Sequence, residues 1–395
     1  MKINEFKSRA NSHQTHWEDL VLLGADGLDE LNDKIEKFIA RLDNHATGIN
    51  LTTKIDGAPA VVCWSKFDDY PDNSICLKSF LTSNKNCLST EEEIEDRYGD
   101  RPNMAVKLKY CLEIAKHIPQ GEAWQGDCLY SSSDLNKIEI DGTEYLTFHP
   151  NKIVYAFSEN NPSYHIIEDS SFGICFHTIY KGNLEHKTQS FSVDATRLTG
   201  VPDGIYIMSP SLNVPQDSSL YNIDEVKKDY GELKSLENKL RVPEYEELCN
   251  NSKIMGFWNT FENHAISDNK TTKINPETFY DEFKEWVKSK VPQNRNFEKN
   301  LNTYYEFIDN NKELIYDMVA CLNKAVDIKM NLWGGLKQAK QDYSTFYKHR
   351  EQGYIPASME GVAYSDADGN IVKIVDRSSF SNVNRDSNYM SGFEH

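Results

Sequence analysis

The sequence predicts a mixed α+β fold that carries an inserted all-helical domain. Between about residues 49 and 208 the apolar runs are short, rich in β-branched residues and bounded by Gly, Asn, Pro or Asp, which is typical of strands. Between about residues 221 and 350 apolar residues recur at helical spacing instead. After residue 350 the strand pattern returns, so we expect the end of the chain to complete a sheet that began before residue 210.

Helices are predicted before the first strand and throughout the inserted segment. In the inserted segment, Asn275 followed by Pro276 is typical of a helix start, and Gly334–Gly335 is typical of a helix end. The first helix is predicted at residues 17–42, because apolar residues recur there at intervals of three and four. These residues are Leu28, Leu31, Ile35, Phe38, Ile39 and Leu42.

The last strands are predicted to form a β-hairpin. Two strand-like runs, residues 359–365 and 371–377, flank a turn at Asp366–Asn370. The hairpin follows the helical segment, so the α+β core is expected to be interrupted by that segment. The predicted units are a first part of the core at 1–215, a helical insertion domain at 216–350, and a final part of the core at 351–395.

Composition limits the class of protein. The chain has 395 residues, of which 39% are hydrophobic, enough for packed cores. No run approaches the roughly 20 apolar residues of a membrane span, and the first residues lack the apolar core of a signal peptide. The eight cysteines are scattered without a C-x-x-C pair, so we expect reduced, mostly buried thiols. We therefore expect a cytoplasmic protein without a membrane partner.

Charge restricts where a polyanion could bind. The chain has 43 Lys and Arg residues against 61 Asp and Glu residues, a net charge of −18. Residues 273–350 depart from this balance, with 13 Lys and Arg residues against 11 Asp and Glu residues. A nucleic-acid site must therefore be local, and the helical domain is its better candidate.

The segment Lys54-Ile55-Asp56-Gly57 is the first candidate for chemistry. The sequence contains neither a G-x-x-x-x-G-K-[ST] loop nor a G-x-G-x-x-G fingerprint, so any phosphate must be held by other residues. Lys54 lies between the apolar runs INLTT and APAVVCW. Burial disfavours the charged form of an amine, so we expect Lys54 to be an uncharged nucleophile. Gly57 would allow the backbone to turn closely beside it.

Further polar residues lie at the end of, or inside, apolar strands. They are Asp127, His177, Glu360 and Lys373. Buried charges need partners, so several such residues predict a common site. A carboxylate beside glycine suits a divalent cation, and a lysine inside a strand suits a phosphate.

Five segments resemble, in order, the motifs of the covalent nucleotidyltransferases, the superfamily of ATP-dependent DNA ligases, RNA ligases and mRNA capping enzymes. They are Lys54–Gly57 (motif I), Gln125–Asp127 (motif III), Gly173–Tyr180 (motif IIIa), Glu360–Val362 (motif IV) and Val372–Ile374 (motif V). The resemblance spans about residues 14–210 and 355–385. Longer strings such as TKIDGAPAVV and HPNKIVYAF are similar to uncharacterised tailed-phage proteins that carry this core.

The resemblance implies a ligase-type adenylyltransferase fold of antiparallel sheets flanked by helices, and a three-step reaction. Lys54 would attack ATP to form lysyl-AMP, AMP would pass to a 5′-phosphate, and a 3′-hydroxyl would displace it, with Asp56 assisting the later steps. Mg²⁺ would bind at Asp127 and Glu360, and Phe176 would stack on adenine. The residues expected to contact the nucleotide are Thr53, Gly57, Asp127, Phe176, Glu360 and Lys373.

The sequence also departs from the family pattern. Pro59 stands where many DNA ligases have arginine, Asp127 stands where glutamate is usual, and Lys373 lacks a second lysine unless Arg377 assists. Only about 20 residues follow motif V, so a C-terminal OB-fold is not expected. Pro59 and the lack of a C-terminal OB-fold resemble the RNA-ligase branch, whereas the weakened motifs III and V favour the alternative of a non-catalytic protein.

The leading hypothesis is therefore an ATP-dependent polynucleotide ligase that prefers RNA over DNA and grips its substrate with the helical domain. One alternative is an AMP transferase that acts on a protein or small molecule. Another is a non-catalytic phage protein that retains the fold as a nucleotide-binding or structural module. The sequence does not specify the native substrate end, the nucleotide preference or the oligomeric state.

Overall fold

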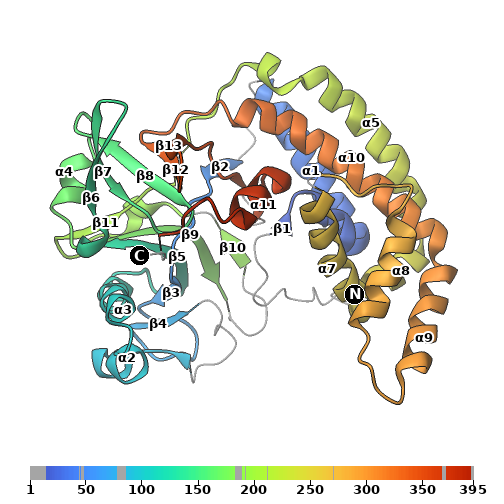
Figure 1. Cartoon of the computed structure of the whole chain (residues 1–395), viewed down its shortest axis with the longest axis horizontal. Coiled ribbons are helices and arrows are strands. Elements are labelled where there is room, and N and C mark those ends of the chain that lie inside the picture. Colours follow the sequence, from blue (N-terminus) through green and yellow to red (C-terminus); the bar gives the residue numbers. More distant parts are fainter. Residues whose placement is uncertain are drawn as a thin grey trace.

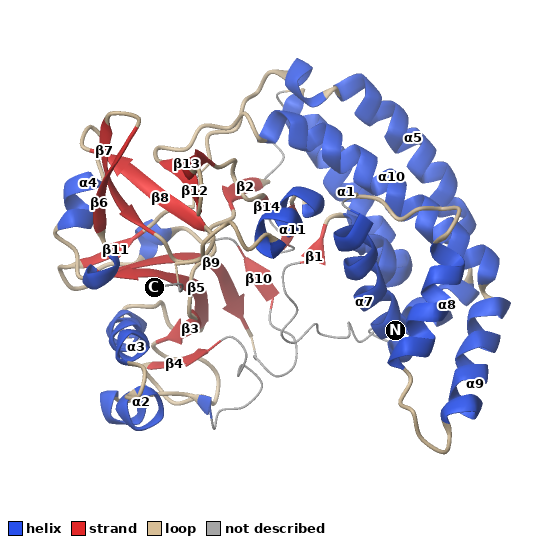
Figure 2. Ribbon diagram, viewed as in Figure 1, coloured by secondary structure: helices blue, strands red, loops and turns tan. Residues whose placement is uncertain are grey.

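Most strands lie in one half of the protein and most helices in the other (Figures 1 and 2). The predicted mixed α+β class is thus confirmed. The structure is a computed structural model. It describes residues 15–43, 45, 49–77, 86–182, 189–191, 193–210, 212–269, 271–366 and 371–392.

A small four-stranded sheet lies between the two halves and joins distant parts of the chain. Its strands, in spatial order, are β1 (Thr15–His16), β15 (Ile371–Ile374), β14 (Val362–Ser365) and β2 (Asn50–Thr53). β14 and β15 form the predicted antiparallel hairpin, and β14 pairs with β2. The prediction that the end of the chain completes an earlier sheet is confirmed, although residues 367–370 of the turn lie outside the described residues.

A large sheet carries the middle motifs. Its strands, in order, are β10 (Gln189–Phe191), β9 (Phe172–Lys181), β5 (Glu122–Ser131), β3 (Ala60–Trp64) and β4 (Ser74–Leu77), with β11 (Ile205–Ile207) also beside β9. Helices α2 (Glu91–Tyr98) and α3 (Pro102–Ala115) lie on this sheet. α3 shares a core with Val61, Trp124 and Phe176, so these three side chains lie on the face of the sheet that α3 covers.

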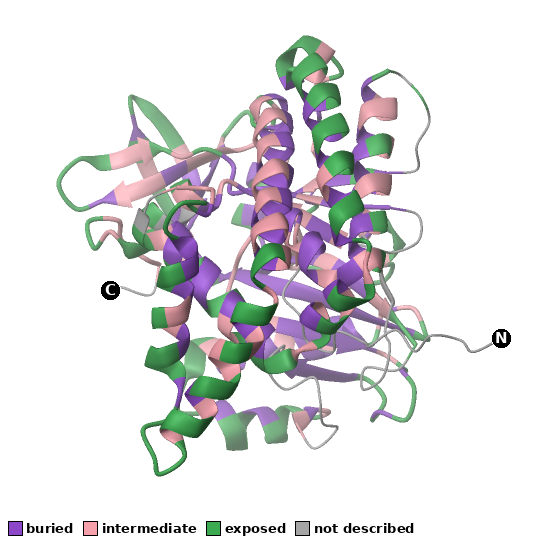
Figure 3. Ribbon diagram, turned by 90° about the vertical axis from the view of Figure 1, so that its right-hand side faces the viewer, coloured by how far each residue is buried: buried purple, intermediate pink, exposed green. Residues whose placement is uncertain are grey.

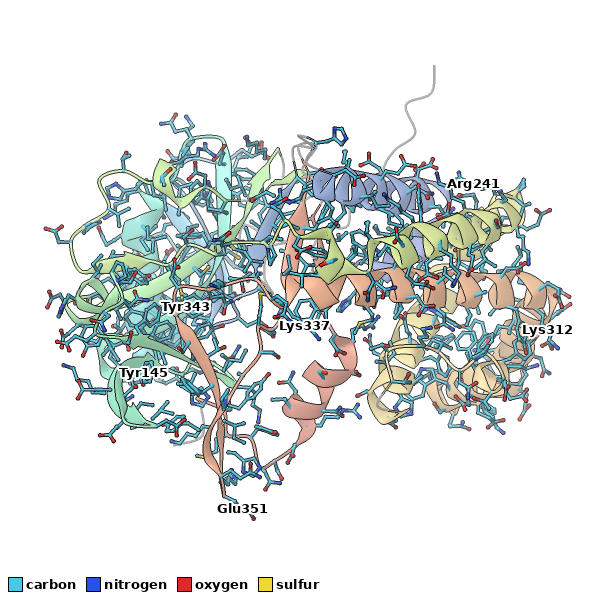
Figure 4. All side chains as sticks on the ribbon, turned by 90° about the horizontal axis from the view of Figure 1, so that it is seen from above. Tyr145, Arg241, Lys312, Lys337, Tyr343 and Glu351 are labelled. Carbon is cyan, nitrogen blue, oxygen red and sulfur yellow. The ribbon has the colours of Figure 1, made fainter. Side chains whose placement is uncertain are left out.

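A third sheet corrects one predicted boundary. Its strands are β13 (Gly353–Pro356), β12 (Ser344–His349), β8 (Ile153–Ser158), β7 (Thr143–Phe148) and β6 (Asn136–Ile140), and the short helix α4 (Tyr164–Glu168) follows β8. β12 pairs with β8, so the boundary predicted at residue 350 is too late. Phe346 and Tyr347 pack on opposite faces of β12, the alternation of a strand. The β12–β13 hairpin projects from the molecule, with Glu351 at its tip (Figure 4).

The helical half contains more than the predicted insertion. Its helices are η1 (Glu18–Leu23), α1 (Gly24–Leu42), η6 (Ser218–Tyr221), α5 (Ile223–Leu240), α6 (Pro243–Asn250), α7 (Ser252–Asn269), α8 (Phe279–Lys290), α9 (Phe297–Asn310) and α10 (Lys312–Leu336). The helix predicted at 17–42 corresponds to η1 and α1, with its apolar stripe turned inward. The prediction that this helix precedes the first strand is wrong, because β1 (Thr15–His16) comes before it.

Buried residues line the inner faces of these helices and exposed residues their outer faces (Figure 3). Lys337, just after α10, lies where the two halves meet, whereas Arg241 and Lys312 lie at the far end of the helical half (Figure 4). One apolar core runs from α1 and α5–α10 to the small sheet, through residues such as Phe38 and Tyr364. Within the described residues, none of the helices combines the length and the apolar character needed to cross a membrane.

Candidate functional site

Lys54 follows β2 directly and reaches two carboxylates. Its Nζ donates a hydrogen bond of 2.7 Å to Oε1 of Glu360 and a second hydrogen bond to Oδ2 of Asp56. The Lys54 side chain is 17% exposed and that of Glu360 is 2% exposed, so the contact is largely shielded from water. Three of the predicted residues therefore lie in one cluster, although 306 positions separate Lys54 from Glu360.

The register of the small sheet explains this meeting. Val362 on β14 pairs with Thr53 on β2, and the Lys54 backbone N–H donates to the Gly361 carbonyl at 2.8 Å. Glu360 thus lies just beyond the end of β2. A Cβ at Gly361 would lie 2.5 Å from a methyl group of Val375, so the close approach of this segment to the end of β15 requires glycine.

The cluster holds Lys54 as an ammonium group. Burial opposes the charge, but the Glu360 and Asp56 carboxylates outweigh it and raise the pKa of Lys54. The prediction of an uncharged amine is therefore wrong for this arrangement, because it considered burial without the two acids. Burial also raises the pKa of Glu360 to about 8, with Asp56 adding to the effect and Lys54 opposing it.

Asp127 lies beside the turn that follows Lys54. Its Oδ2 accepts a hydrogen bond of 3.3 Å from the Gly57 N–H. The turn packs against β5 backbone to backbone, since a Cβ at Gly57 would lie 2.3 Å from the Cys128 carbonyl oxygen and Ala58 N–H donates to that same oxygen at 2.9 Å. The predicted role of Gly57, close backbone approach, thus has a physical basis.

A β-bulge adds His177 to this group. Gln125 pairs with Thr178 but Gly126 pairs with Phe176, so His177 is the extra residue of β9. Its Nε2 lies 4.0 Å from Oδ1 of Asp127. The sequence marked His177 as a polar residue in an apolar strand, but the bulge that aims it had no sequence signal.

Lys373 lies near enough to Lys54 for their charges to interact. It sits on β15 between Ala363 of β14 and His16 of β1. Burial, together with the charge of Lys54, lowers the pKa of Lys373 to about 8. Arg377, predicted as a possible second cation, acts on Lys373 through its charge but donates its hydrogen bonds to other acids, among them Glu262 at 2.9 Å.

Phe176 and Thr53 are placed differently from the expectation. Phe176 is fully buried and packs edge-on against Trp124, with ring centroids 5.7 Å apart. It pairs with Gly126, the neighbour of Asp127, and so points to the other face of the large sheet. A base could not stack on it without opening that core. Thr53 is buried, and its hydroxyl accepts a hydrogen bond of 2.7 Å from Gln341.

A cavity of about 170 Å³ adjoins the carboxylates. Its lining residues are Asp56, Asn151, Lys152, Ile153, Tyr347, Glu360, Val383 and Asn384. Asn151 donates to the Asp56 carbonyl at 3.0 Å, and Lys152 donates to the carbonyl of Tyr389. The sequence did not indicate that Asn151, Lys152, Tyr347 and Asn384 line this cavity. The string HPNKIVYAF contains two of them, whereas Tyr347 fell within the segment assigned to helices and Asn384 comes from α11 (Arg377–Arg385).

The fit of the site to Mg²⁺ is partial. Among the described residues no three His, Cys, Asp or Glu side chains converge as a metal-binding group. Oε2 of Glu360 is nevertheless buried and receives no hydrogen bond from a described residue. Mg²⁺ in nucleotide sites is commonly held by one or two carboxylates, with phosphates and water completing its shell. The donor chemistry at Glu360 therefore suits a cation that arrives with a phosphate-bearing substrate.

The comparisons with known proteins give one finding. Residues 11–388 match a family that is described as a family of unknown function (DUF6267). No curated protein and no solved structure matches the chain.

Proposed function

This chain belongs to the DUF6267 family, and we propose that it is an ATP-dependent nucleotidyltransferase that carries AMP on Lys54. The observation that supports the proposal is the meeting of Lys54 with Asp56 and Glu360, beside Asp127 and Lys373. These are the residues that the motif resemblance selects from distant parts of the chain. The ligase-type adenylyltransferase fold is part of the same proposal.

The first step requires Lys54 to lose a proton. Glu360 is placed to accept it, because its Oε1 already accepts a hydrogen bond from Nζ of Lys54 and burial raises its affinity for a proton. The neutral amine attacks the α-phosphorus of ATP, so that a P–N bond forms, the bond to the bridging oxygen breaks and pyrophosphate leaves. Lys373 faces the negative charge that grows on the α-phosphate. Mg²⁺, when bound at Glu360 and Asp127 with the nucleotide, would supply charge neutralisation.

We further propose that the acceptor is a polynucleotide 5′-phosphate, and that RNA is preferred over DNA. AMP would pass from Lys54 to the 5′-phosphate, and a 3′-hydroxyl would then displace AMP and seal the strand. The positive balance of residues 273–350 supports substrate contact through the helical half. The missing arginine at Pro59 supports the RNA-ligase branch.

The test of the first step is label transfer from α-labelled ATP with magnesium, read by denaturing electrophoresis. Wild-type protein should retain label, and both Lys54→Ala and Lys54→Arg should lose it, since arginine keeps the charge but supplies no neutral amine. Lys34→Met is the matched control, because Lys34 is also buried and paired with a carboxylate, at 3.0 Å from Asp366. Label on Lys54→Ala, or no label on wild type, would contradict the proposal.

The acceptor is tested separately with pre-adenylated protein. Nicked duplexes, nicked tRNA and single-stranded RNA with a 5′-phosphate are each offered in turn. AMP should appear on an RNA 5′-phosphate end faster than on DNA. If AMP reaches no nucleic acid while Lys54 still becomes labelled, the ligase step is refuted and AMP transfer to another class of acceptor remains.

A further inference from the structure

Cys76 and Cys87 face each other across two paired segments at the edge of the large sheet. Ile75 and Leu88 exchange both backbone hydrogen bonds, at 2.9 Å and 2.8 Å, in an antiparallel bridge. Moving one residue along each segment brings Cys76 opposite Cys87 at a non-hydrogen-bonded position. Cα atoms at such positions are about 4.5 Å apart, within the range of about 4.4–6.8 Å that a disulfide spans.

Two other features agree with this register. Both cysteines belong to the same apolar cluster, which also contains Val62, Trp64 and Ala123, so their side chains point to one side. Both are free thiols. A bond between them therefore requires no movement of one side chain through the sheet.

The two thiols are chemically unequal. A hydrogen bond from Cys76 lowers the pKa of Cys87, with burial opposing and the charge of Arg97 assisting. Arg97 is fixed nearby, since its Nη1 donates to the Asn86 carbonyl at 3.3 Å. Cys87 is also more exposed, at 8% against 1% for Cys76. Cys87 is thus the nucleophile of the pair and Cys76 the resolving thiol.

We propose that Cys76 and Cys87 form a modification site that a hydroperoxide converts into a disulfide. The Cys87 thiolate attacks one oxygen of hydrogen peroxide, so that an S–O bond forms, the O–O bond breaks and the departing hydroxide takes a proton to become water. Cys76 then attacks the sulfur of the Cys87 sulfenic acid, an S–S bond forms, and the S–O bond breaks to release a second water. Two thiols and one peroxide thus give one disulfide and two waters.

The chain contains a matched control pair. The sulfurs of Cys111 and Cys128 lie 3.6 Å apart, so this pair is also in contact. Both are fully buried, and burial raises the pKa of each well above its usual value. Neither should form a thiolate that attacks peroxide, so this pair is expected to stay reduced.

The experiment treats the full chain with hydrogen peroxide, blocks the remaining thiols and maps peptides without reduction. We expect a Cys76–Cys87 peptide pair, the loss of two of the eight thiols, and full reversal by dithiothreitol. In Cys76→Ser, Cys87 should remain as a sulfenic acid that dimedone traps, whereas in Cys87→Ser residue Cys76 should stay reduced.

Circular dichroism of the variants checks that they fold. The wild-type map decides the proposal even if a variant does not fold. A Cys111–Cys128 link that forms first, or a wild type in which Cys87 remains a thiol, would overturn it. The test uses no nucleotide, so its outcome is independent of the proposed transferase activity.

Discussion

Two glycines determine how closely the backbone approaches Lys54. Gly57 brings the turn after Lys54 against the Cys128 carbonyl, and Gly361 brings the Glu360 segment against Val375. Both positions leave no room for a side chain. The Lys54 cluster therefore depends on the lack of a side chain at these two glycines as well as on its charged groups.

Replacing Gly57 with alanine should destabilise the protein and reduce label transfer. The new Cβ would lie 2.3 Å from a backbone oxygen, so the turn must shift, at a cost of about 1–3 kcal/mol. Urea unfolding measures the change. Gly256→Ala in α7 is the control, because no atom lies within 4 Å of its Cβ, and it should stabilise the protein by about 1 kcal/mol. Equal effects of the two changes would refute this account.

Lys373 should make nucleotide binding depend on pH. Its pKa of about 8 means that the ammonium is present below pH 8 and lost above it. A hydrogen bond to a charged group contributes about 1.5–3 kcal/mol, so the KM for ATP in label transfer should rise about tenfold between pH 7 and pH 9.5. Lys373→Arg keeps its charge over this range, so its KM should rise less than that of the wild type, because only the titration of Glu360 remains. A parallel rise in that variant would argue against Lys373 as the phosphate-binding cation.

At the scale of elements, a buried charge cluster joins helices to the small sheet. Arg377, the first residue of α11, donates to Glu18 and Asp19 near the start of the chain and to Glu262 of α7. Lys329 of α10 donates to Glu18 at 2.6 Å. Glu18, Asp19 and Glu262 thus share Arg377 and Lys329 as direct partners in a largely buried space. His16 lies near Glu18 and Lys373 near Asp19, and burial favours a proton on one of the acids.

Glu262 is the residue that should hold this proton. Burial, with the charge of Asp19 adding, raises the pKa of Glu262 to about 8. A raised folded-state pKa contributes stability that is complete below the unfolded value near 4.5 and is lost as the pH rises through 8. Glu262→Gln should remove this loss, so its stability relative to wild type should increase by about 1–4 kcal/mol between pH 5 and pH 9. Urea unfolding at pH 5, 7 and 9 measures it, and a constant difference would contradict the assignment.

Sequence patterns predicted those elements whose signals are local. The first helix and the final hairpin were found because their apolar spacing and turn residues lie within one segment. Gly334–Gly335 predicted a helix end, but α10 continues through both glycines to Leu336. Gly335 serves packing instead, because a Cβ there would lie 2.4 Å from the Tyr221 ring. Asn275–Pro276 predicted a helix start, but α8 begins at Phe279. The Asn275 side chain accepts a hydrogen bond from the Glu277 N–H in the turn before the helix.

Most residues of the candidate site were also predictable from local patterns. The placement of Phe176 was not, because it depends on how two strands pair. Lys54, Asp56, Asp127 and Glu360 could be named because each is a polar residue beside or within a short apolar run and falls in a segment that resembles a family motif. Phe176 was wrong because the face of a strand residue depends on register, and the bulge at His177 is a property of the pairing of β9 with β5. No pattern within either strand specifies that pairing.

At the scale of the whole molecule, the helical half and the small sheet share one core, whereas the two larger sheets pack in cores of their own. The Phe38 ring lies 5.8 Å from Tyr221 of η6 and 6.5 Å from Tyr364 of β14. Trp17 packs on the same Tyr364 ring at 5.9 Å. The helical segment therefore buries its apolar surface against α1 and the small sheet, and it does not have the separate core of an independent domain.

Phe38→Ala should therefore weaken the helical half and the small sheet together. Removing a fully buried ring costs about 3–5 kcal/mol. Thermal unfolding should move to lower temperature as a single transition, with the far-ultraviolet signal of the helices and the near-ultraviolet signal of the aromatic residues shifting together. A helical signal that stays at the wild-type unfolding temperature would contradict this account.

The small sheet also has a consequence for synthesis of the protein on the ribosome. Its four strands come from residues 15–16, 50–53, 362–365 and 371–374, so the nascent chain holds Lys54 without its partner while 306 further positions are added to reach Glu360. At about 5–20 residues per second this delay lasts roughly 15–60 s. A prematurely terminated chain would thus carry Lys54 and Asp56 without Glu360, so the cluster is completed only when translation is nearly finished.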